Sequence, residues 1–493
     1  MNMDKPLRRV AIFGLLLFFG LMAQVNYVQG SQAQSLRDDK RNTRKFADVF
    51  NAFRGQITAG GEVLAQSQDT GKDNPKYGRT YKDGPIFSPV TGFWNGSPSR
   101  GVEFAYNSLL GGSDKRITRK HWFDYLIGKQ AEGADVELAL NTDAQRVAYE
   151  RLKATTSRRA GAAVIDIKTG AVKVLASFPS YDPNEVAPQK GTAGGKRLEQ
   201  LDGQPGVIKP LIDNAMSQTF PPGSSFKTVV AATAMEQMGL NEQSTVDTSQ
   251  LVLPESNRPL PNDSDSGPCG GQAPLKLAFA ESCNTTFGRF ALRLGIQKLH
   301  DAAKNFGFGE TVDVEPDLGA AKSDVPVSIR DPKTGQQINT GQDGTARSGI
   351  GQENVRATPL QMAMVASAVA NGGKIMNPYL VQKVRAKDQS SLYDAKPKMY
   401  SQPMKSDTAD QIKDMMKAVV AEGTAKNLQG QNIAGKTGTA EQGPGIPNAR
   451  WFVGYSPIEN PRYAFAVVTE GEGFGATGAG PIAAAIMQAV LKK

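Results

Sequence analysis

An uncharged apolar run close to the amino terminus constrains this chain more than any other stretch of its sequence. Residues 10–28 contain no charged side chain, and Lys5, Arg8 and Arg9 precede them. A helix of this length rises about 28 Å, which matches a bilayer core of about 30 Å. A cleaved signal peptide is the alternative, but no convincing small-x-small cleavage site follows the run. We therefore expect residues 10–28 to form a single membrane anchor after a short tail of residues 1–9.

The orientation of this anchor does not follow from its flanking charges. Further basic residues come soon after the run, at Arg37, Lys40, Arg41, Arg44 and Lys45. The positive-inside rule counts basic residues near both ends of a span, so it does not favour an exterior carboxyl-terminal part here. The orientation has to follow from the chemistry of the remaining chain.

Composition limits the class of protein. The 493 residues suffice for about two to four domains. With 39% hydrophobic and 21% charged residues, the chain is not a coiled coil, a collagen or a mostly disordered protein. Two histidines and two cysteines exclude a zinc finger, and a Ser-His-Asp hydrolase would have to use His121 or His300. A net charge of +9 without a long basic tract does not indicate nucleic-acid binding.

The chain after the anchor divides into two regions. Residues 30–157 are expected to form a small mixed domain, and residues 158–493 a larger α+β domain. In the first region we expect a turn between short strands over 54–66, a loop over 70–100, a strand over 136–140 and a helix over 142–152, capped at Thr142 or Asn141.

The second region has strand patterns at both ends and helical patterns between them. Two apolar runs, 161–166 and 171–177, flank Lys168-Thr169-Gly170 and predict a hairpin. Helices are expected over 224–238, 274–295, 297–305, 358–371 and 407–422, strands near 451–455 and 463–469, and a last helix starting at Pro481. This order predicts a sheet built from segments that are distant in the sequence.

The segment Phe220-Pro221-Pro222-Gly223-Ser224-Ser225-Phe226-Lys227 carries the first chemical signal. Its two prolines and glycine lead into an apolar helical pattern, which places Ser224 at a helix start with free backbone N–H groups. Lys227 lies three residues later, on the same helical face, where a neutral amine can accept the hydroxyl proton. Ser225 points elsewhere. Alone, the motif is more typical of an N-cap serine beside a solvated lysine.

Two further motifs become informative when they are considered together with Ser224 and Lys227. Ser282-Cys283-Asn284 would supply a hydroxyl for proton relay and an amide for substrate binding, although alone it reads as a polar loop. Lys-Thr-Gly occurs at 168–170, 333–335 and 436–438. Only Lys436 lies in a strand pattern of small residues, with a further hydroxyl at Thr439, where a lysine offers positive charge to a substrate carboxylate.

Ser-x-x-Lys, Ser-x-Asn and Lys-Thr-Gly in this order resemble the signature of penicillin-binding proteins and serine β-lactamases. The spacings, 58 residues from Ser224 to Ser282 and 154 from Ser282 to Lys436, suit the penicillin-binding branch. Arg54-Gly55-Gln56-Ile57 and Gly101–Tyr106 also resemble the non-catalytic part of class B members. The whole pattern is most similar to the penicillin-binding protein A type of actinobacteria, although the N-terminal domain is shorter than in most class B members.

The resemblance implies a role for each motif residue. Ser224 would be the acylated nucleophile, Lys227 its base, Ser282 a proton relay and Asn284 a substrate-amide ligand. The substrate carboxylate would be held at the third motif, by Lys436, Thr437, Gly438 and Thr439. The backbone N–H groups of Ser224 and Thr439 would form the oxyanion hole. The family needs no cofactor and no metal. Burial and the nearby charge of Lys436 would lower the pKa of Lys227.

The resemblance also implies the fold, the activity and the localisation of the protein. The fold would be an antiparallel sheet flanked by helices with a helical subdomain. The activity would be D,D-transpeptidation of peptidoglycan stem peptides with a D-Ala-D-Ala donor, inhibited by β-lactams. The amino terminus would then be cytoplasmic and the catalytic region outside the membrane, where cell-wall synthesis proteins would be its protein partners. A D,D-carboxypeptidase or β-lactamase, and a non-enzymatic β-lactam sensor or wall-synthesis scaffold, are the alternatives.

The two cysteines, Cys269 and Cys283, lie 14 residues apart, and the second lies inside the Ser-x-Asn motif. An exterior compartment permits a disulfide between them. Closing a loop of about 15 residues contributes about 3 kcal/mol in the chain-entropy model. Two buried free thiols are the alternative, and the sequence does not decide between them.

Overall fold

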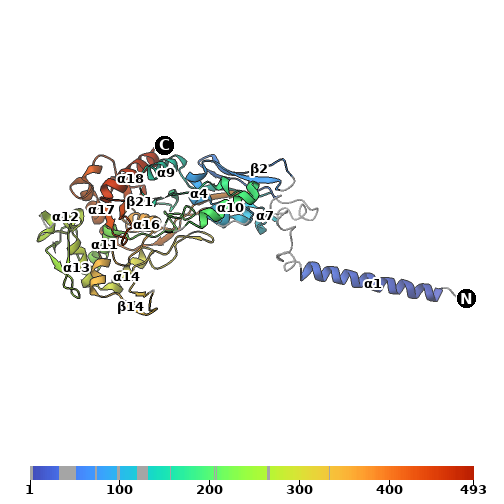
Figure 1. Ribbon diagram of the computed structural model, residues 1–493, viewed down its shortest axis with the longest axis horizontal. Helices are drawn as coiled ribbons and strands as arrows, with labels where there is room; N and C mark the ends of the chain where they lie inside the picture. Colours follow the sequence, from blue (N-terminus) through green and yellow to red (C-terminus); the bar gives the residue numbers. More distant parts are fainter. Residues whose placement is uncertain are drawn as a thin grey trace.

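The computed structural model describes residues 4–32, 52–72, 75–96, 100–118, 132–155, 157–204, 206, 208–263, 267–331 and 333–492. Figure 1 shows one long helix, α1 (Asp4–Gly30), projecting from a folded body that contains all other labelled elements. The carboxyl terminus lies on the body, beside the helix α9 (Thr142–Lys153).

Helix α1 exposes apolar side chains around its whole circumference. Leu16 and Phe19, for example, are 65% and 63% exposed. Its segment Pro6–Gln29 is the one helix in the described part of the chain that is long and apolar enough to cross a membrane. The helix includes residues 4–9, which the sequence assigned to a tail. The exposed apolar surface is what a single membrane anchor requires.

A five-stranded antiparallel sheet forms the centre of the larger region. Its order is β19 (Ala434–Ala440), β20 (Ala449–Ser456), β21 (Tyr463–Glu470), β5 (Ala160–Asp166) and β6 (Val172–Phe178). Strands from both ends of the region thus pair side by side, which confirms the predicted α+β sheet. The wholly buried helix α16 (Pro359–Ala370) packs on one face, and α9 and α18 (Gly475–Leu491) cover the other (Figure 1).

The start of the last helix differs from the prediction. α18 begins at Gly475 and carries Pro481 inside it. A Cβ at position 475 would lie 2.1 Å from the carbonyl oxygen of Trp451 and 2.6 Å from that of Gly438, so only glycine allows this close approach to the sheet. Packing of this first turn against β19 and β20 outweighs the loss of one helical hydrogen bond at the proline.

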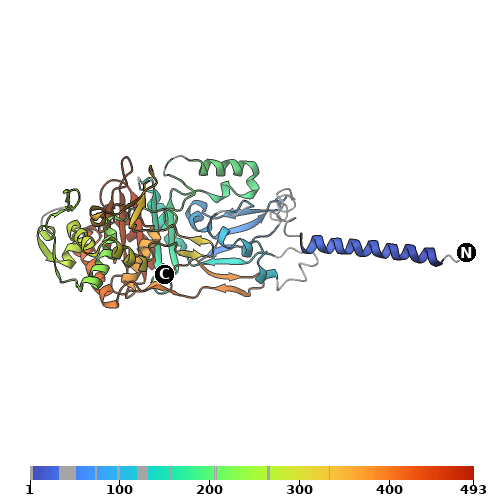
Figure 2. The same ribbon diagram turned by 90° about the horizontal axis from the view of Figure 1, so that it is seen from below.

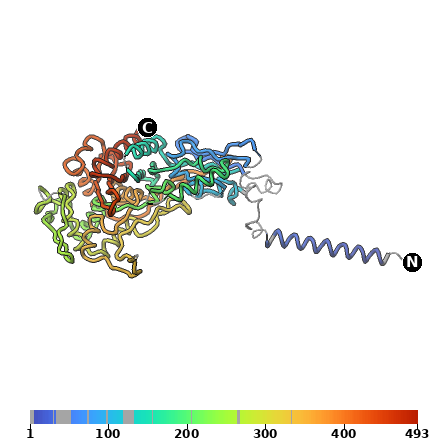
Figure 3. Tube along the Cα trace, viewed as in Figure 1, coloured from blue at the N-terminus to red at the C-terminus, as the bar shows by residue number. Residues whose placement is uncertain are grey.

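The helical subdomain lies beside the sheet (Figure 1 and Figure 3). Its helices are α11 (Lys227–Met238), α12 (Leu275–Ala280), α13 (Asn284–Leu294), α14 (Ile296–Asn305), α15 (Gln342–Ser348) and α17 (Ser406–Ala421). The pattern over 274–295 is therefore two helices rather than one. The break occurs at Ser282, whose φ of 62° is left-handed and cannot continue a helix.

A second sheet of six strands contains parts of both predicted regions. Its order is β17 (Ser391–Asp394), β16 (Val381–Arg385), β4 (Asp135–Leu138), β1 (Ile57–Ala59), β2 (Glu62–Asp69) and β3 (Tyr77–Tyr81). The orange strands β16 and β17 lie beside the blue amino-terminal strands in Figure 2. Chain from beyond residue 157 therefore completes the sheet of the N-terminal region.

The expected loop over 70–100 is wrong in part, because it contains β3 and the helix α4 (Gly84–Thr91). The sequence analysis read glycine and proline there as loop signals. Pro85 instead occupies the first turn of α4, where its missing N–H costs no hydrogen bond. Tyr81 is buried, and its hydroxyl accepts a hydrogen bond of 2.8 Å from the backbone N–H of Trp94.

Candidate active site

The serine of the first motif sits on a tight turn at the start of a buried helix. A 3₁₀ turn, η3 (Gly223–Phe226), leads directly into α11. Gly223 has a φ of 52°, and a Cβ there would lie 2.5 Å from the carbonyl oxygen of Thr439, so glycine is required beside β19. Ser224 is half-buried and lines a cavity. Ser225 is fully buried and donates to the Pro222 carbonyl at 2.7 Å.

Lys227 is fully buried and its amine faces the second motif. Nζ donates to the carbonyl oxygen of Ser282 at 2.7 Å, to its Oγ at 3.0 Å and to Oδ1 of Asn284 at 2.6 Å. The left-handed backbone of Ser282 turns both of its oxygens toward this amine. The break between α12 and α13 thus brings together two motifs that lie 55 residues apart.

The third motif reaches the same hydroxyl from the opposite side. Lys436, on β19, is fully buried and donates to Oγ of Ser282 at 2.9 Å and to the carbonyl oxygen of Thr437 at 3.2 Å. The Ser282 hydroxyl is therefore in hydrogen-bond contact with two lysine amines at once. No carboxylate forms an ion pair with either lysine among the described residues.

Burial sets the protonation of both lysines. It lowers the pKa of Lys227 well below its ordinary value, and the charge of Lys436 lowers it further, against a smaller opposing effect of Asp263. Burial also lowers the pKa of Lys436 to about 7, although Asp263 and Glu281 act in the opposite direction. The lowered pKa favours the neutral form of the Lys227 amine, which is the form that can accept a proton.

The predicted site residues line one cavity of about 960 Å³. Its wall includes Ser224, Ser282, Asn284, Thr437, Gly438 and Thr439. The two lysines lie buried behind this wall. The structure thus brings all three motifs together. Such a volume accommodates a drug-sized or short-peptide ligand.

The other two Lys-Thr-Gly sites lie away from the cavity. Lys168 is in the β5–β6 turn, where its Nζ donates to Oδ1 of Asn371 at 2.9 Å. Lys333 is in an exposed turn, where its backbone N–H donates to Oδ1 of Asp331 at 2.8 Å. His300 contacts the carbonyl oxygen of Val325 and does not line the cavity, and His121 lies outside the described residues.

Two residues that the sequence analysis did not select also belong to the site. Thr424 lines the cavity, and its Oγ1 lies 2.7 Å from Oγ1 of Thr437, so the two hydroxyls share a hydrogen bond. Asp263 lines the cavity too and is the acidic residue that most opposes the lowered pKa of Lys436. Neither residue stands in a recognisable motif. Asp263 lies in the segment over 241–270, which reads only as a polar insertion.

The two cysteines are joined in the structure. Cys269 and Cys283 form a disulfide with a Cα–Cα distance of 5.3 Å. The bond attaches the short turn η4 (Gly267–Cys269) to the residue between Ser282 and Asn284. It therefore holds the outer polar insertion against the Ser-x-Asn motif. In the described part of the chain no group of three or more His, Cys, Asp or Glu side chains is placed to hold a metal ion.

Comparison with known proteins gives the family of the chain. The family described as "Penicillin binding protein transpeptidase domain" matches residues 160–492, and "Penicillin binding protein A dimerisation domain" matches residues 54–136. The chain belongs to the penicillin-binding protein transpeptidases. This confirms the family, the fold class and the enzyme class that the three motifs predicted.

Relatives extend the similarity over the whole of this transpeptidase. It is 33% identical to the peptidoglycan D,D-transpeptidase PbpA of Mycolicibacterium smegmatis, over 100% of both chains. Among solved structures it resembles penicillin-binding protein A from M. tuberculosis in its penicillin G acyl-enzyme complex, with a TM-score of 0.78, 29% identity and coverage of 90% of this chain and 100% of that one. The imipenem acyl-enzyme complex of the same protein gives a TM-score of 0.79.

Proposed function

We propose that this chain is a membrane-anchored peptidoglycan D,D-transpeptidase that acts through an acyl-enzyme on Ser224. The observation that carries the proposal is the contact of one hydroxyl, Ser282 Oγ, with both buried amines, beside a half-buried serine at a helix start. Such a site can remove a proton from a serine, stabilise an oxyanion and return the proton to a leaving amine. Its substrates are stem peptides that end in D-Ala-D-Ala, and β-lactams acylate the same serine.

Acylation begins with proton transfer from Ser224 Oγ to the neutral amine of Lys227. Oγ attacks the carbonyl carbon between the two D-alanines and forms a tetrahedral oxyanion. We assign the oxyanion hole to the backbone N–H groups of Ser224 and Thr439, whose segments are neighbours because the glycine at 223 lets η3 lie directly against β19. Preorganised donors of this kind typically contribute about 10²–10³-fold in rate.

Collapse of the intermediate breaks the peptide bond and needs a proton for the leaving amine. Ser282 is placed to relay it, because its hydroxyl contacts Lys227 and lines the cavity. Asn284 holds Lys227 through Oδ1, while its Nδ2 donates to the carbonyl oxygen of Pro261 at 2.8 Å. The second N–H of that amide group remains to bind the peptide carbonyl of the donor. D-alanine leaves, and the acyl group stays on Ser224.

The terminal carboxylate of the donor binds at the third motif. The hydroxyls of Thr437 and Thr439 line the cavity, and the charge of Lys436 lies directly behind them. A carboxylate close to Lys436 raises the pKa of that lysine and keeps it protonated while the donor is bound. Gly438 lets β19 pack closely against the turn that carries Ser224, because a Cβ there would lie 2.6 Å from the Pro222 carbonyl oxygen.

We place residues 1–9 in the cytoplasm and the catalytic region outside the membrane. Peptidoglycan lies on that side, and the disulfide between Cys269 and Cys283 is a bond that an oxidising exterior preserves. The N-terminal region, residues 30–157, stays non-catalytic in this proposal, since none of its described residues lines the cavity. It would offer a surface to cell-wall synthesis proteins.

Labelling of the full-length, detergent-solubilised protein with a fluorescent penicillin tests the assignment. We expect the label on Ser224, complete loss of labelling in Ser224→Ala and near-normal labelling in the matched control Ser225→Ala. Label mapped to another residue would overturn the assignment. With a pentapeptide donor and an amine acceptor, cross-linked product supports a transpeptidase, whereas hydrolysed tetrapeptide alone would indicate a carboxypeptidase.

A further inference from the structure

One segment in the wall of the reaction cavity, part of the polar insertion over 241–270, is attached to the second motif at three points. The carbonyl oxygen of Pro261 accepts a hydrogen bond of 2.8 Å from Nδ2 of Asn284. Oδ1 of Asn262 accepts one of 3.1 Å from the backbone N–H of Thr285. The disulfide described above is the third attachment. The segment therefore keeps a defined position beside the Ser-x-Asn motif.

Asp263 is the charged residue that this segment brings to the cavity wall. It is exposed, and in the described part of the chain its carboxylate forms no ion pair. Burial lowers the pKa of Lys227 and of Lys436, and the charge of Asp263 acts against this effect on both amines. Because both amines contact Oγ of Ser282, Asp263 lies within electrostatic range of the hydroxyl that relays protons.

The other acidic residues of this wall are placed differently. Glu353 is paired with Arg347, with 3.4 Å between Oε2 and Nη1. Glu441 follows the end of β19, and its charge does not contribute to the pKa shift of either lysine. Asp263 is therefore the unpaired carboxylate of the described wall that acts on the reaction centre.

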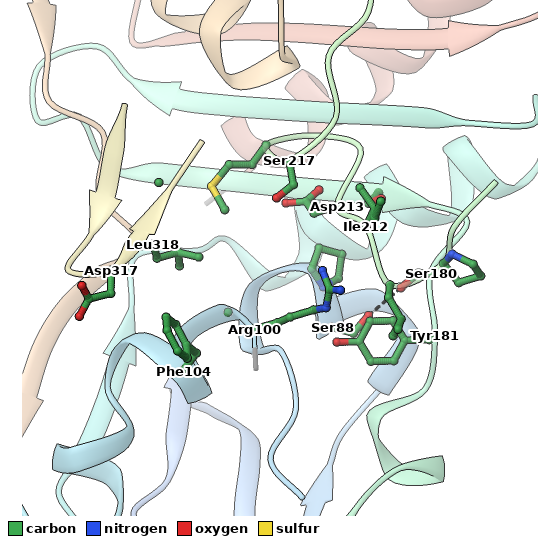
Figure 4. A pocket seen from close by; sticks show the side chains of 17 residues that line it. Ser88, Arg100, Phe104, Ser180, Tyr181, Ile212, Asp213, Ser217, Asp317 and Leu318 are labelled. Carbon is green, nitrogen blue, oxygen red and sulfur yellow. Dashed lines mark hydrogen bonds between the residues drawn. The ribbon is translucent and has the colours of Figure 1, made fainter. Parts of the chain in front are cut away.

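An aspartate in a second cavity shows the contrasting case. This cavity, of about 210 Å³, lies at the junction with the N-terminal region, and Figure 4 shows the side chains that line it. Its Asp213 is buried, with Oδ1 accepting from the backbone N–H of Ala215 at 2.7 Å and Oδ2 closed off from solvent. A ligand cannot reach that carboxylate, whereas the exposed carboxylate of Asp263 is open to one.

The second half of the proposed reaction needs an amine on this side of the cavity. In acylation, Ser282 relays a proton to the leaving amine. By microscopic reversibility, the amine that attacks the acyl-enzyme takes the position that the leaving amine vacated, within reach of the same hydroxyl. A primary alkyl amine has a pKa of about 10.4, so it arrives at neutral pH as a cation, which an exposed carboxylate attracts.

On the basis of the proposed function, we infer that Asp263 binds the primary ammonium group of the acceptor stem peptide. The ammonium group then loses one proton to solvent, and the amine nitrogen attacks the ester carbonyl carbon on Ser224. Its second proton passes through Ser282 and Lys227 to Oγ of Ser224 as the C–O bond breaks. A new amide and a free serine result. Asp263 acts on binding of the acceptor, before this chemical step.

The partition of the acyl-enzyme between two nucleophiles tests this role, because the product ratio does not depend on how fast the acyl-enzyme forms. Full-length protein in detergent receives a D-Ala-D-Ala peptide donor whose amino groups are acetylated. Nα-acetyl-lysinamide serves as the cationic acceptor, well below saturation, and methanol as the neutral one. Mass spectrometry gives the ratio of amide to methyl ester.

We expect Asp263→Asn to lower this ratio about fivefold, while Asp263→Glu keeps it within about twofold of wild type. Glu281→Gln is the matched control, because Glu281 also opposes the effect of burial on Lys436 but does not line the cavity, so the ratio should not change. Glu441→Gln should also leave it unchanged. Added salt should lower the wild-type ratio toward that of Asp263→Asn, whose own ratio should be insensitive to salt.

An unchanged ratio in Asp263→Asn, or an equal loss in Glu281→Gln, would overturn the inference. So would a loss in Glu441→Gln alone, or a wild type that forms the ester but no amide. If Asp263→Asn does not fold, the salt dependence of the wild-type ratio decides. If the donor leaves no acyl group on Ser224, detected by intact-protein mass spectrometry, the proposed function fails and the inference fails with it.

Discussion

Two clusters of buried ionisable side chains differ in how their charges are paired. One lies in the N-terminal region, and the other lies behind the cavity. In the first, Glu103 lies between two arginines, with Arg54 Nη2 2.6 Å and Arg79 Nε 2.7 Å from its carboxylate oxygens. Burial alone would raise the pKa of Glu103, but the two arginines lower it below its ordinary value. All three side chains are almost wholly buried, and opposite charges lie in direct contact.

The second cluster consists of two lysine amines, and no carboxylate of the described residues forms an ion pair with either of them. Lys227 and Lys436 share only the hydroxyl of Ser282, and burial lowers the pKa of both. The first arrangement fixes charges and favours a rigid structure. The second makes protonation of an amine unfavourable, which a general base requires. The difference indicates that the Glu103 cluster has a structural role and that the Lys227–Lys436 cluster serves the reaction.

The largest effect is expected from removing the amine of Lys227, which we propose as the base. Lys227→Met keeps most of the side-chain volume and should lower the rate constant of penicillin acylation by about 10³-fold, since general bases contribute about 10²–10⁴-fold. Thermal unfolding should change only modestly, because the gain from replacing a buried amine by an apolar group opposes the loss of its hydrogen bonds to Ser282 and Asn284. Acylation within tenfold of wild type would show that Lys227 is not the base.

The three Lys-Thr-Gly sites test the comparison further, because they place the same tripeptide in one buried and two exposed environments. Lys436→Ala should lower the acylation rate by about 10²-fold, because it removes the charge behind the carboxylate site. Lys168→Ala and Lys333→Ala carry the same change at surface turns and serve as matched controls, with rates close to wild type. Stopped-flow measurement with a fluorescent penicillin compares all three. Equal losses would mean that the buried position of Lys436 has no special role.

A substitution in the Glu103 cluster should lower the stability of the protein rather than the rate of acylation. Glu103→Gln leaves two buried guanidinium groups without a charged partner, and breaking a buried pair typically costs about 3–5 kcal/mol. We expect a large fall in the free energy of unfolding, measured in urea, with an unchanged acylation rate in the protein that remains folded. Glu62→Gln, whose partners are partly exposed, should cost at most about 1 kcal/mol. Similar costs for both variants would contradict the account of this cluster.

The disulfide should have the smallest effect on chemistry. Replacing Cys269 and Cys283 together by serine should lower the free energy of unfolding by about 3 kcal/mol, the entropy of closing this loop in the unfolded chain. The acylation rate should fall only a few-fold, because Ser282 and Asn284 keep their contacts with Lys227. A loss as large as that of Lys436→Ala would mean that the bridge, and not the lysines, orders the site.

Local patterns in the sequence predicted the catalytic region well. The hairpin of β5 and β6 and the position of Ser224 depend on residues close in the chain, as does the cap of α9 before this region, which was expected at Thr142 or Asn141 and is formed by Asn141. The choice of Lys436 over two identical tripeptides depended on the pattern of small residues around it. The resemblance to a known family then supplied the roles of these residues.

Features decided by distant contacts were not predictable in the same way. α18 starts six residues before Pro481 because Gly475 packs against the backbone of Trp451. β16 and β17 join a sheet of the N-terminal region although they follow residue 157 by more than 200 residues. Thr424 enters the site only through its contact with Thr437. No sequence pattern near these positions indicates which distant residue they contact.

The pH dependence of penicillin acylation in Lys436→Met tests the central claim most directly. If Lys227 is the base and the charge of Lys436 helps to lower its pKa, removing that charge must raise the pKa of Lys227. The acid limb of the rate profile, which reports protonation of the base, should then move to higher pH than in the wild type, in addition to the overall loss of rate. An acid limb that stays in place or moves to lower pH would contradict the account.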